Sequence, residues 1–182
     1  MINPFNFLLF ILFTGNTVLG NNVCHQDSLV LIKKSFNLYK SGDFYFSGQP
    51  DSIDILFLDS LGIDLVVNLR SSREVEYHTQ HQFDEDHLLQ SLQIDHVHIP
   101  LGGKEGFYPS AVDSLSSVLE GNYSKILIHC RRGGRVTLLW MAYLVNSLGY
   151  SIDEAVAIGD DMGYFFPLDD LLGYKISFQK VE

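Results

Sequence analysis

The sequence predicts an α/β domain in which a central, mostly parallel sheet carries helices on both faces. Two observations predict this class. The runs within 65–69 and 125–129 have the apolar composition of strands that are buried on both sides. Between such strands the chain repeatedly shows helical patterns that begin at capping residues. No internal repeat or low-complexity linker interrupts this alternation, so we expect a single domain over residues 21–182.

Local signals place the elements of the N-terminal half. The pattern over 21–34 is weak and favours only a short helix, whereas 44–50 predicts an aromatic strand that enters a turn. Asp51 or Ser52 caps a helix that ends at Gly62, and Ser71-Ser72-Arg73-Glu74 forms a capping-box pattern. We therefore expect helices over 51–60, 71–80 and 84–92.

The C-terminal half contains the segment with the strongest signal for burial. Residues 96–100 alternate as a half-buried strand does, and the glycine-rich segment 101–108 is a loop before a helix that begins at Pro109 and runs to 119. Residues 136–148 are apolar on nearly every side, which indicates a helix in the middle of the protein. A capping box at 151–154 begins a further helix to about residue 158, and the tail from 163 is weakly patterned.

The first twenty residues have the features of an export signal. An apolar run from Phe5 to Phe13 precedes small and β-branched residues, of which Val18 and Gly20 suit cleavage after Gly20. The run is too short for a spanning helix, which needs around 20 apolar residues. We expect residues 1–20 to be a signal peptide and the mature protein to be periplasmic or secreted, without stable membrane insertion after the signal is removed.

Charge excludes some partners and indicates a local anion site. The chain has 182 residues and a net charge of −10, and its first twenty residues carry no charged side chain. Nucleic acid and anionic membrane surfaces would repel such a protein. Against this background Arg131, Arg132 and Arg135 gather three of the twelve basic residues within five positions. This positive cluster predicts an anion-binding site.

The cysteine content leaves two roles open for Cys130. The chain has only two cysteines, Cys24 and Cys130, which are too few for a disulfide scaffold or a four-ligand zinc site. In an oxidising compartment the two could form a structural bridge between the mature N-terminus and the core. The alternative is that Cys130 is a reactive thiol.

The segment His129-Cys130-Arg131-Arg132-Gly133-Gly134-Arg135 joins a predicted strand to the central helix. In a strand–loop–helix arrangement, backbone N–H groups and the helix N-terminus converge on a point just beyond the strand. Gly133 and Gly134 allow the loop to turn these N–H groups inward. The helix dipole and the nearby arginines would stabilise the thiolate of Cys130 and make it a nucleophile. Arg135 would donate two parallel hydrogen bonds to a bound oxyanion, and His129 would orient the loop.

An ordered set of motifs around this loop resembles the bacterial dual-specificity-phosphatase-like family of the protein tyrosine phosphatase superfamily, which also occurs fused to beta-lactamase-like hydrolases. The resemblance spans about 44–163. It implies a phosphatase-like three-layer sandwich, hydrolysis of phosphomonoesters through a phosphocysteine, and no metal or other cofactor. The residues that carry it are Ser47-Gly48-Gln49-Pro50, Gly62-Ile63, Val67-Asn68-Leu69-Arg70 with Glu74, His98-Ile99-Pro100-Leu101, Cys130-x-x-Gly133-x-Arg135-Val136 and Leu139-Trp140.

The spacing of the loop departs from most of the superfamily and leaves a second function open. Four residues separate Cys130 from Arg135, one fewer than in most members, although Thr137 keeps the hydroxyl expected just after the arginine. The bacterial subfamily is similar in having the short spacing. A six-residue loop also resembles that of rhodanese sulfurtransferases, which hold a persulfide. A Cys130 persulfide, and an anion-binding module without turnover, are therefore the alternatives to a phosphatase.

The resemblance also implies a general acid on the loop after the Ile-Pro strand, where superfamily phosphatases place an aspartate. The only carboxylate between Leu101 and Tyr108 is Glu105, which we take as the candidate acid. Arg70 and Glu74 are expected to form a structural pair that orders the neighbouring loop. The expected partner is a phosphorylated protein or a small phosphate ester, bound by the loop residues Arg131, Arg132, Gly133, Gly134 and Arg135, with Cys130 as nucleophile and His129 and Thr137 in support.

Overall fold

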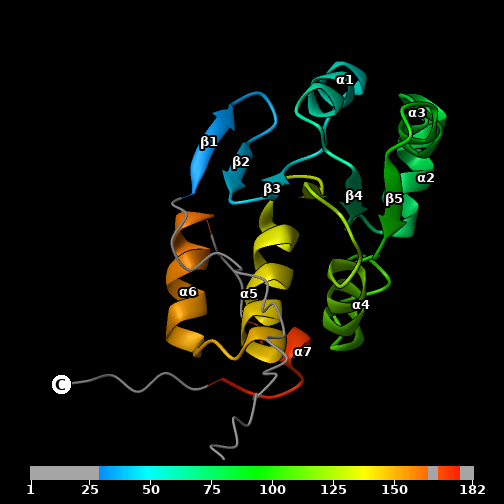
Figure 1. The fold of residues 1–182 in the computed structure, drawn as a ribbon. Coiled ribbons are helices and arrows are strands. Elements are labelled where there is room, and N and C mark those ends of the chain that lie inside the picture. Colours follow the sequence, from blue (N-terminus) through cyan, green and yellow to red (C-terminus); the bar gives the residue numbers. More distant parts are fainter. Residues whose placement is uncertain (1–28, 164–167, 177–182) are drawn as a thin grey trace, which may run out of the picture.

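The computed structural model describes residues 29–163 and 168–176. The predicted signal peptide and Cys24 lie outside these described residues. A six-stranded sheet forms the centre of the fold, in the order β1-β2-β3-β6-β4-β5 (Figure 1). The strands β3, β6, β4 and β5 are parallel neighbours, while β1 and β2 extend the β3 edge as antiparallel strands. The six strands are β1 (Val30–Lys33), β2 (Leu38–Ser41), β3 (Phe44–Ser47), β4 (Leu65–Asn68), β5 (Asp95–His98) and β6 (Ile126–His129).

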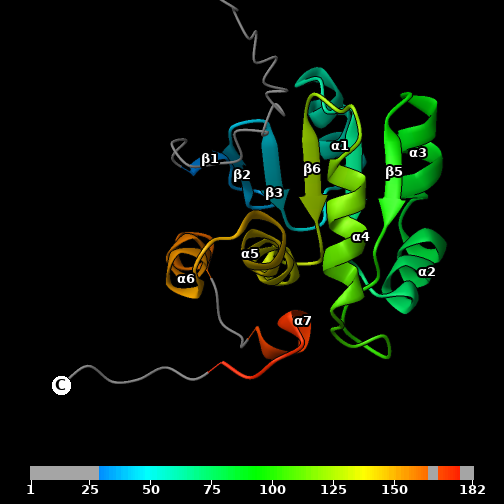
Figure 2. The same ribbon diagram turned by 60° about the horizontal axis from the view of Figure 1, so that its bottom comes forward.

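Helices cover both faces of the sheet, as the sequence predicts, and the views in Figures 1 and 2 show the layers. One face packs against α4 (Ser110–Leu119), α5 (Gly134–Leu148), α6 (Ile152–Asp161) and α7 (Asp169–Leu172). The other face packs against α1 (Ser52–Ser60) and α3 (Glu85–Ser91). Helix α2 (Ser72–His81) follows β4. No helix within the described residues is long and apolar enough to span a membrane.

Alternation along the parallel strands separates the two cores. In β4, Leu65 and Val67 face the α4–α5 layer, whereas Val66 faces α1 and α3. In β6, Ile126 and Ile128 lie on the first side and Leu127 on the second. Because both faces are buried, the strands show the continuous apolar composition that predicted a covered sheet. Helix α5 lies against the centre of the sheet, and its residues from Val136 to Leu144 are all buried.

Two expectations at the ends of the chain are wrong or incomplete. Part of the predicted helix at 21–34 is a strand, because Val30 to Lys33 pair with β2 and extend the edge of the sheet. Three β-branched or leucine side chains in a row favour a strand once a partner edge is available. Helix α7 in the weakly patterned tail was not predicted, since its four residues are too few to show a helical period.

Candidate active site

The Cys130–Arg135 loop lies at the carboxyl edge of the parallel strands. Strand β6 ends at His129 between its neighbours β3 and β4, and α5 begins at Gly134 after the cap residue Gly133. Ligands bind at this edge in open α/β sheets, because the loops there are held by several strands at once. The loop is therefore in the position that the sequence predicts for an anion site.

The sulfur of Cys130 contacts the loop backbone. The amide of Gly133 donates to Sγ of Cys130 over 3.1 Å. Gly133 has φ of +97°, a left-handed backbone region that favours glycine, and a Cβ there would meet no atom within 4 Å. Glycine is thus needed for its backbone conformation, and not because a side chain would clash with a neighbour. Thr137 supports the same residue, since its hydroxyl donates to the carbonyl oxygen of Gly133 over 3.4 Å. Cys130 is buried and is a free thiol.

Arg135 is held beside the loop by a bidentate pair with Glu74. Its Nη1 lies 2.6 Å from Oε2 of Glu74, and its Nη2 lies 3.0 Å from Oε1. Nη1 also donates to the carbonyl oxygen of Leu101 over 2.8 Å. Burial lowers the pKa of Arg135, but the hydrogen bonds to Glu74 and the charge of Cys130 outweigh burial and raise it. The guanidinium is therefore a fixed cation next to the sulfur.

The carboxylate of Glu74 has a partner that the sequence did not indicate, Arg135. Arg70 and Glu74 do contact each other, as expected, but not through the carboxylate of Glu74. Arg70 instead donates to the backbone oxygen of Glu74 over 3.0 Å and to Oε1 of Gln49 over 2.7 Å. Burial opposes ionisation of Glu74, but the bonds from Arg135 and Ser71 lower its pKa to about 2. Glu74 also closes the capping box of α2, so one carboxylate fixes both a helix start and an arginine.

A buried carboxylate, Glu85, lies beneath the loop. Its Oε1 is 2.9 Å from Nε2 of His129, an ion-pair contact whose geometry is not that of an aligned hydrogen bond. Its Oε2 accepts from Nε2 of Gln49 at 3.0 Å and from Nδ2 of Asn68 at 3.3 Å. Burial would raise the pKa of Glu85, but the contacts with His129 and Gln49 lower it to about 2. This ionised group connects the ends of β3, β4 and β6.

Glu85 was missed at the level of sequence. It lies in an acidic stretch whose carboxylates look alike, and only the packing of α3 on the sheet sets it apart. His129, which the sequence predicts to orient the loop, does contact this group.

The 47–50 segment holds the loop from its other side. The amide of Cys130 donates to the carbonyl oxygen of Ser47 over 3.3 Å, and that of Gln49 to the carbonyl oxygen of Arg131 over 3.3 Å. A Cβ on Gly48 would lie 3.2 Å from the oxygen of Arg131 and 3.2 Å from that of Phe36. Gly48 is thus required by the close approach of two backbones.

The position of Glu105 argues against a role as proton donor. The loop that carries it is closed by a hydrogen bond from the amide of Gly102 to the oxygen of Gly106, over 2.7 Å. The exposed carboxylate of Glu105 accepts from the amide of Ser72 over 3.0 Å, at the start of α2. The hydrogen bonds from Ser72 lower the pKa of Glu105, whereas a general acid needs a raised pKa.

A pocket of about 270 Å³ opens beside Cys130. Its polar wall is the loop, and its apolar wall comes from Phe107 and Leu138. The side chains of Arg131 and Arg132 are exposed at its rim. Among residues 29–163 and 168–176, no cluster of three or more His, Cys, Asp or Glu side chains could hold a metal ion. The pocket is lined by Phe107, Cys130, Arg131, Arg132, Gly134, Arg135 and Leu138.

Comparison with solved structures identifies the fold. TpbA from P. aeruginosa superimposes with a TM-score of 0.59 and 20% sequence identity, over 82% of this chain and 89% of that one. A DUF442 protein from Shewanella putrefaciens CN-32, described as a candidate phosphatase, gives a TM-score of 0.55 and 19% identity over 75% and 88% of the two chains. The chain has a phosphatase fold.

Two further structures with this fold are of variants in which a cysteine is replaced by serine. A variant of kinase associated phosphatase with its catalytic-site cysteine replaced by serine gives a TM-score of 0.52 and 22% identity, over 63% of this chain and 71% of that one. A cysteine-to-serine variant of TpbA was solved in complex with phosphotyrosine. No family model matches the sequence of this chain, and no curated protein sequence matches it. The similarity therefore lies in the fold.

Proposed function

We propose that this chain is a cysteine-dependent phosphatase that hydrolyses aryl phosphate monoesters of the phosphotyrosine type. The observation that carries the proposal is the arrangement at the loop. The Gly133 amide contacts the sulfur of Cys130, and the guanidinium of Arg135 is held beside it by Glu74. A nucleophile, backbone amides and a fixed cation at one pocket are the groups that phosphoryl transfer to sulfur requires.

The reaction proceeds in two displacements at phosphorus. In the first, the sulfur of Cys130 forms a bond to phosphorus while the P–O bond to the aryl group breaks and an aryloxide leaves. In the second, water attacks phosphorus, the S–P bond breaks, and inorganic phosphate leaves with the thiolate restored. The enzyme supplies position and charge stabilisation, which dominate catalysis of phosphoryl transfer.

Arg135 has donors left for the phosphoryl oxygens. A guanidinium has five N–H groups. Within the described chain, Nη1 makes two hydrogen bonds and Nη2 makes one, which uses three of them. The Nε–H and one Nη2–H remain, and they point in parallel in a guanidinium. Glu74 thus fixes the arginine and leaves a bidentate edge for phosphate.

Two features of the pocket indicate an aryl leaving group: its apolar wall, and the position of Glu105, which does not suit a general acid. Phe107 and Leu138 offer an apolar surface beside Cys130 that suits an aromatic ring. A phenol has a pKa near 10 and leaves without prior protonation far more easily than an alkyl alcohol. We therefore propose aryl phosphates as substrates, with Glu105 serving to hold the start of α2.

Hydrolysis of p-nitrophenyl phosphate by the purified, reduced protein tests the proposal, with Cys130→Ser as the matched variant. We expect turnover that the serine variant loses completely. Equal rates for the two proteins would overturn the proposal. In parallel, incubation with thiosulfate and cyanide tests the short loop for sulfur transfer. A sulfur adduct on Cys130 with thiocyanate formation would favour the sulfurtransferase, and phosphate binding without either reaction would favour a binding module.

We also propose that the protein acts outside the cytoplasm. The apolar segment 1–20 and its cleavage-compatible end support this proposal. The intact mass of protein recovered from the periplasm or the medium is the test. A chain that begins at Asn21 is the expected result, and retention of the full-length chain inside the cell would contradict it.

A further inference from the structure

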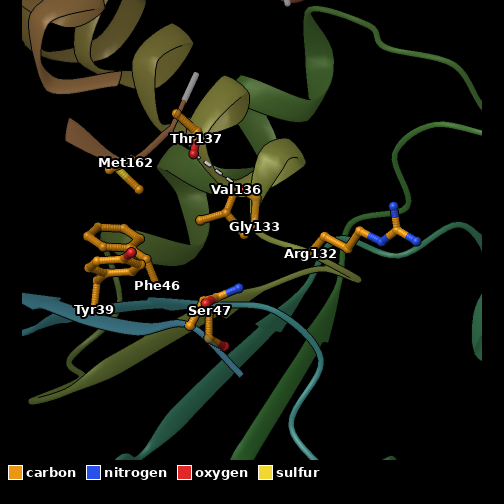
Figure 3. Close-up of a pocket in the computed structure, with 9 residues that line it drawn as sticks. Tyr39, Phe46, Ser47, Arg132, Gly133, Val136, Thr137 and Met162 are labelled. Carbon is orange, nitrogen blue, oxygen red and sulfur yellow. Dashed lines mark hydrogen bonds between the residues drawn. The ribbon is translucent and has the colours of Figure 1, made fainter. Parts of the chain in front are cut away.

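A second cavity lies on the other side of the catalytic loop from the pocket beside Cys130. Its volume is about 160 Å³. Figure 3 shows the side chains that surround it, drawn from β2, β3, α5 and the end of α6. Arg132 lines both this cavity and the pocket beside Cys130, so the two adjoin at the loop. The cavity is lined by Asn37, Tyr39, Phe46, Ser47, Arg132, Gly133, Val136, Thr137 and Met162.

One side of this cavity is apolar and aromatic, whereas the side formed by Asn37, Ser47, Thr137 and the loop is polar. The rings of Tyr39 and Phe46 lie together on one side, and Met162 and Val136 lie above them (Figure 3). Phe46 and Val136 are buried, whereas Tyr39 and Met162 are half-buried and therefore reach the surface. An apolar cavity of about 150 Å³ can hold a benzene ring. Aromatic faces and a thioether sulfur are favourable contacts for such a ring.

Two of the polar side chains in the cavity already donate hydrogen bonds to the backbone. The hydroxyl of Ser47 already donates to the oxygen of Gly48 over 2.7 Å. That of Thr137 donates to the oxygen of Gly133. The side chain of Arg132 runs away from Tyr39 and Phe46 (Figure 3), so the one cation at the rim does not enter the apolar part. An uncharged ring whose face packs against Tyr39, Phe46 and Met162 is the group that the apolar side of this cavity fits.

The two cavities share Arg132 in their linings. We propose that the cavity at Tyr39 and Met162 binds an aromatic side chain of a phosphotyrosine peptide, close in sequence to the phosphotyrosine. This inference rests on the proposed phosphatase function. With the phosphate over Cys130, the peptide passes along Arg132, and a neighbouring aromatic residue enters the cavity. Substrates of this class bind more tightly than p-nitrophenyl phosphate, which occupies only the first pocket.

Short peptides test the pairing of phosphotyrosine with an aromatic neighbour. The reference peptide has phosphotyrosine with three alanines on either side. In each further peptide, one of these six alanines is replaced by phenylalanine or by aspartate. Burial of one aromatic side chain corresponds to a gain of about tenfold or more in kcat/KM. We expect this gain for phenylalanine at one or two positions and not for aspartate.

Variants at the mouth of the cavity connect the preference to its residues. Tyr39→Ser and Met162→Gln change half-buried side chains, and Met162→Trp fills the space. In each variant, the ratio of kcat/KM for the phenylalanine peptide to that for p-nitrophenyl phosphate should fall about tenfold. Tyr174→Ser changes an exposed tyrosine on α7's C-terminal side and is the matched control, for which the ratio should stay as in the wild type.

The outcomes separate this inference from the proposed function. No hydrolysis of p-nitrophenyl phosphate by the wild type would contradict the phosphatase itself. Hydrolysis without a phenylalanine preference, or a preference that Tyr39→Ser and Met162→Trp both leave intact, would overturn the subsite alone. A preference for aspartate instead would assign peptide recognition to Arg131 and Arg132 and would also overturn it. Thermal melting of each variant verifies that the fold is intact.

Discussion

The two carboxylates next to the catalytic loop, Glu74 and Glu85, are both ionised but are held in different surroundings. Glu74 lies at the start of α2, is partly exposed, and holds the guanidinium of Arg135 with both oxygens. Glu85 lies at the start of α3, is buried, and holds His129, Gln49 and Asn68. The first holds the side chain that we propose binds phosphate, and the second holds side chains at the ends of three strands.

Because of this difference, we expect Glu74 to contribute mainly to turnover and Glu85 mainly to the free energy of folding. A partly exposed ion pair adds little to the free energy of folding, because water screens it. Breaking the contacts of a buried charge lowers the free energy of folding strongly, because water cannot replace the lost partners. We therefore expect changes on the Glu74 side to lower turnover and changes at Glu85 to lower stability.

The largest expected effect is at Arg135. Arg135→Lys removes the bidentate edge and keeps the charge, and kcat/KM for an aryl phosphate should fall about 100- to 1000-fold. The matched control is Arg73→Lys, an exposed arginine on α2, which should behave as the wild type. A variant Arg135→Lys with wild-type kinetics would remove Arg135 from the phosphate site.

Glu85→Ala should have the largest effect on stability. It removes the acceptor of Gln49 and Asn68 and the charged neighbour of His129, and the free energy of unfolding should fall by about 3 kcal/mol. Urea denaturation measures this change. Glu76→Ala, at an exposed position of α2, is the control and should change stability by at most about 0.5 kcal/mol. Equal stability of the two variants would contradict the role assigned to Glu85.

Glu74→Gln should affect turnover more than stability. The amide cannot hold Arg135 with two charged contacts, so kcat should fall about tenfold, in line with loss of positioning. The free energy of unfolding should fall by only about 1 kcal/mol, the range for a helix cap and an exposed pair. If Glu74→Gln instead lost stability and kept its kcat, the division between the two carboxylates would be wrong.

Acid should weaken the protein through the same two groups. The pKa of Glu74 and of Glu85 is lowered from the ordinary 4.5 to about 2 in the folded protein. The unfolded chain therefore takes up protons first as the pH falls, and stability is lost between about pH 4.5 and pH 2. Relative to the wild type, Glu85→Gln should be less stable at pH 7, and this deficit should shrink toward pH 3. A constant deficit in melting temperature across this range would contradict the low pKa of Glu85.

The smallest expected effect is at Glu105. Because its carboxylate is bound to the amide of Ser72, Glu105→Gln should change kcat for p-nitrophenyl phosphate by less than about twofold, well below the effect of losing a general acid. The pH profile on its alkaline side should also be unchanged. A loss of about 100-fold, with loss of the alkaline limb, would restore Glu105 as the proton donor.

Local patterns were sufficient to predict most of the fold. The caps at Asp51, Ser71, Asp84 and Ser151 all accept the hydrogen bonds that begin their helices, within one or two residues of the predicted starts. The buried runs of β4 and β6 predicted a covered sheet. Strand β1 could not be predicted, because Val30 to Lys33 become a strand only through pairing with β2, which no local pattern shows.

The candidate site was only partly predictable for the same reason. The contacts of Cys130, Gly133 and Thr137 are local to the loop and follow from its composition. The partner of Arg135 lies on another element, so the sequence indicated the contact between Arg70 and Glu74 but not the bidentate pair between Arg135 and Glu74. Glu85 could not be predicted, because it reaches the site only through the packing of α3 against the ends of three strands.

Trapping the covalent intermediate tests most directly whether Cys130 is the nucleophile beside a fixed Arg135. Wild-type protein is mixed with an excess of p-nitrophenyl phosphate, quenched in acid within milliseconds, and digested for mass spectrometry. The peptide that contains Cys130 should carry one phosphoryl group, and the same peptide from Cys130→Ser should carry none. A phosphoryl group on another residue, or turnover by the wild type without any phosphorylated peptide at Cys130, would contradict the proposed mechanism.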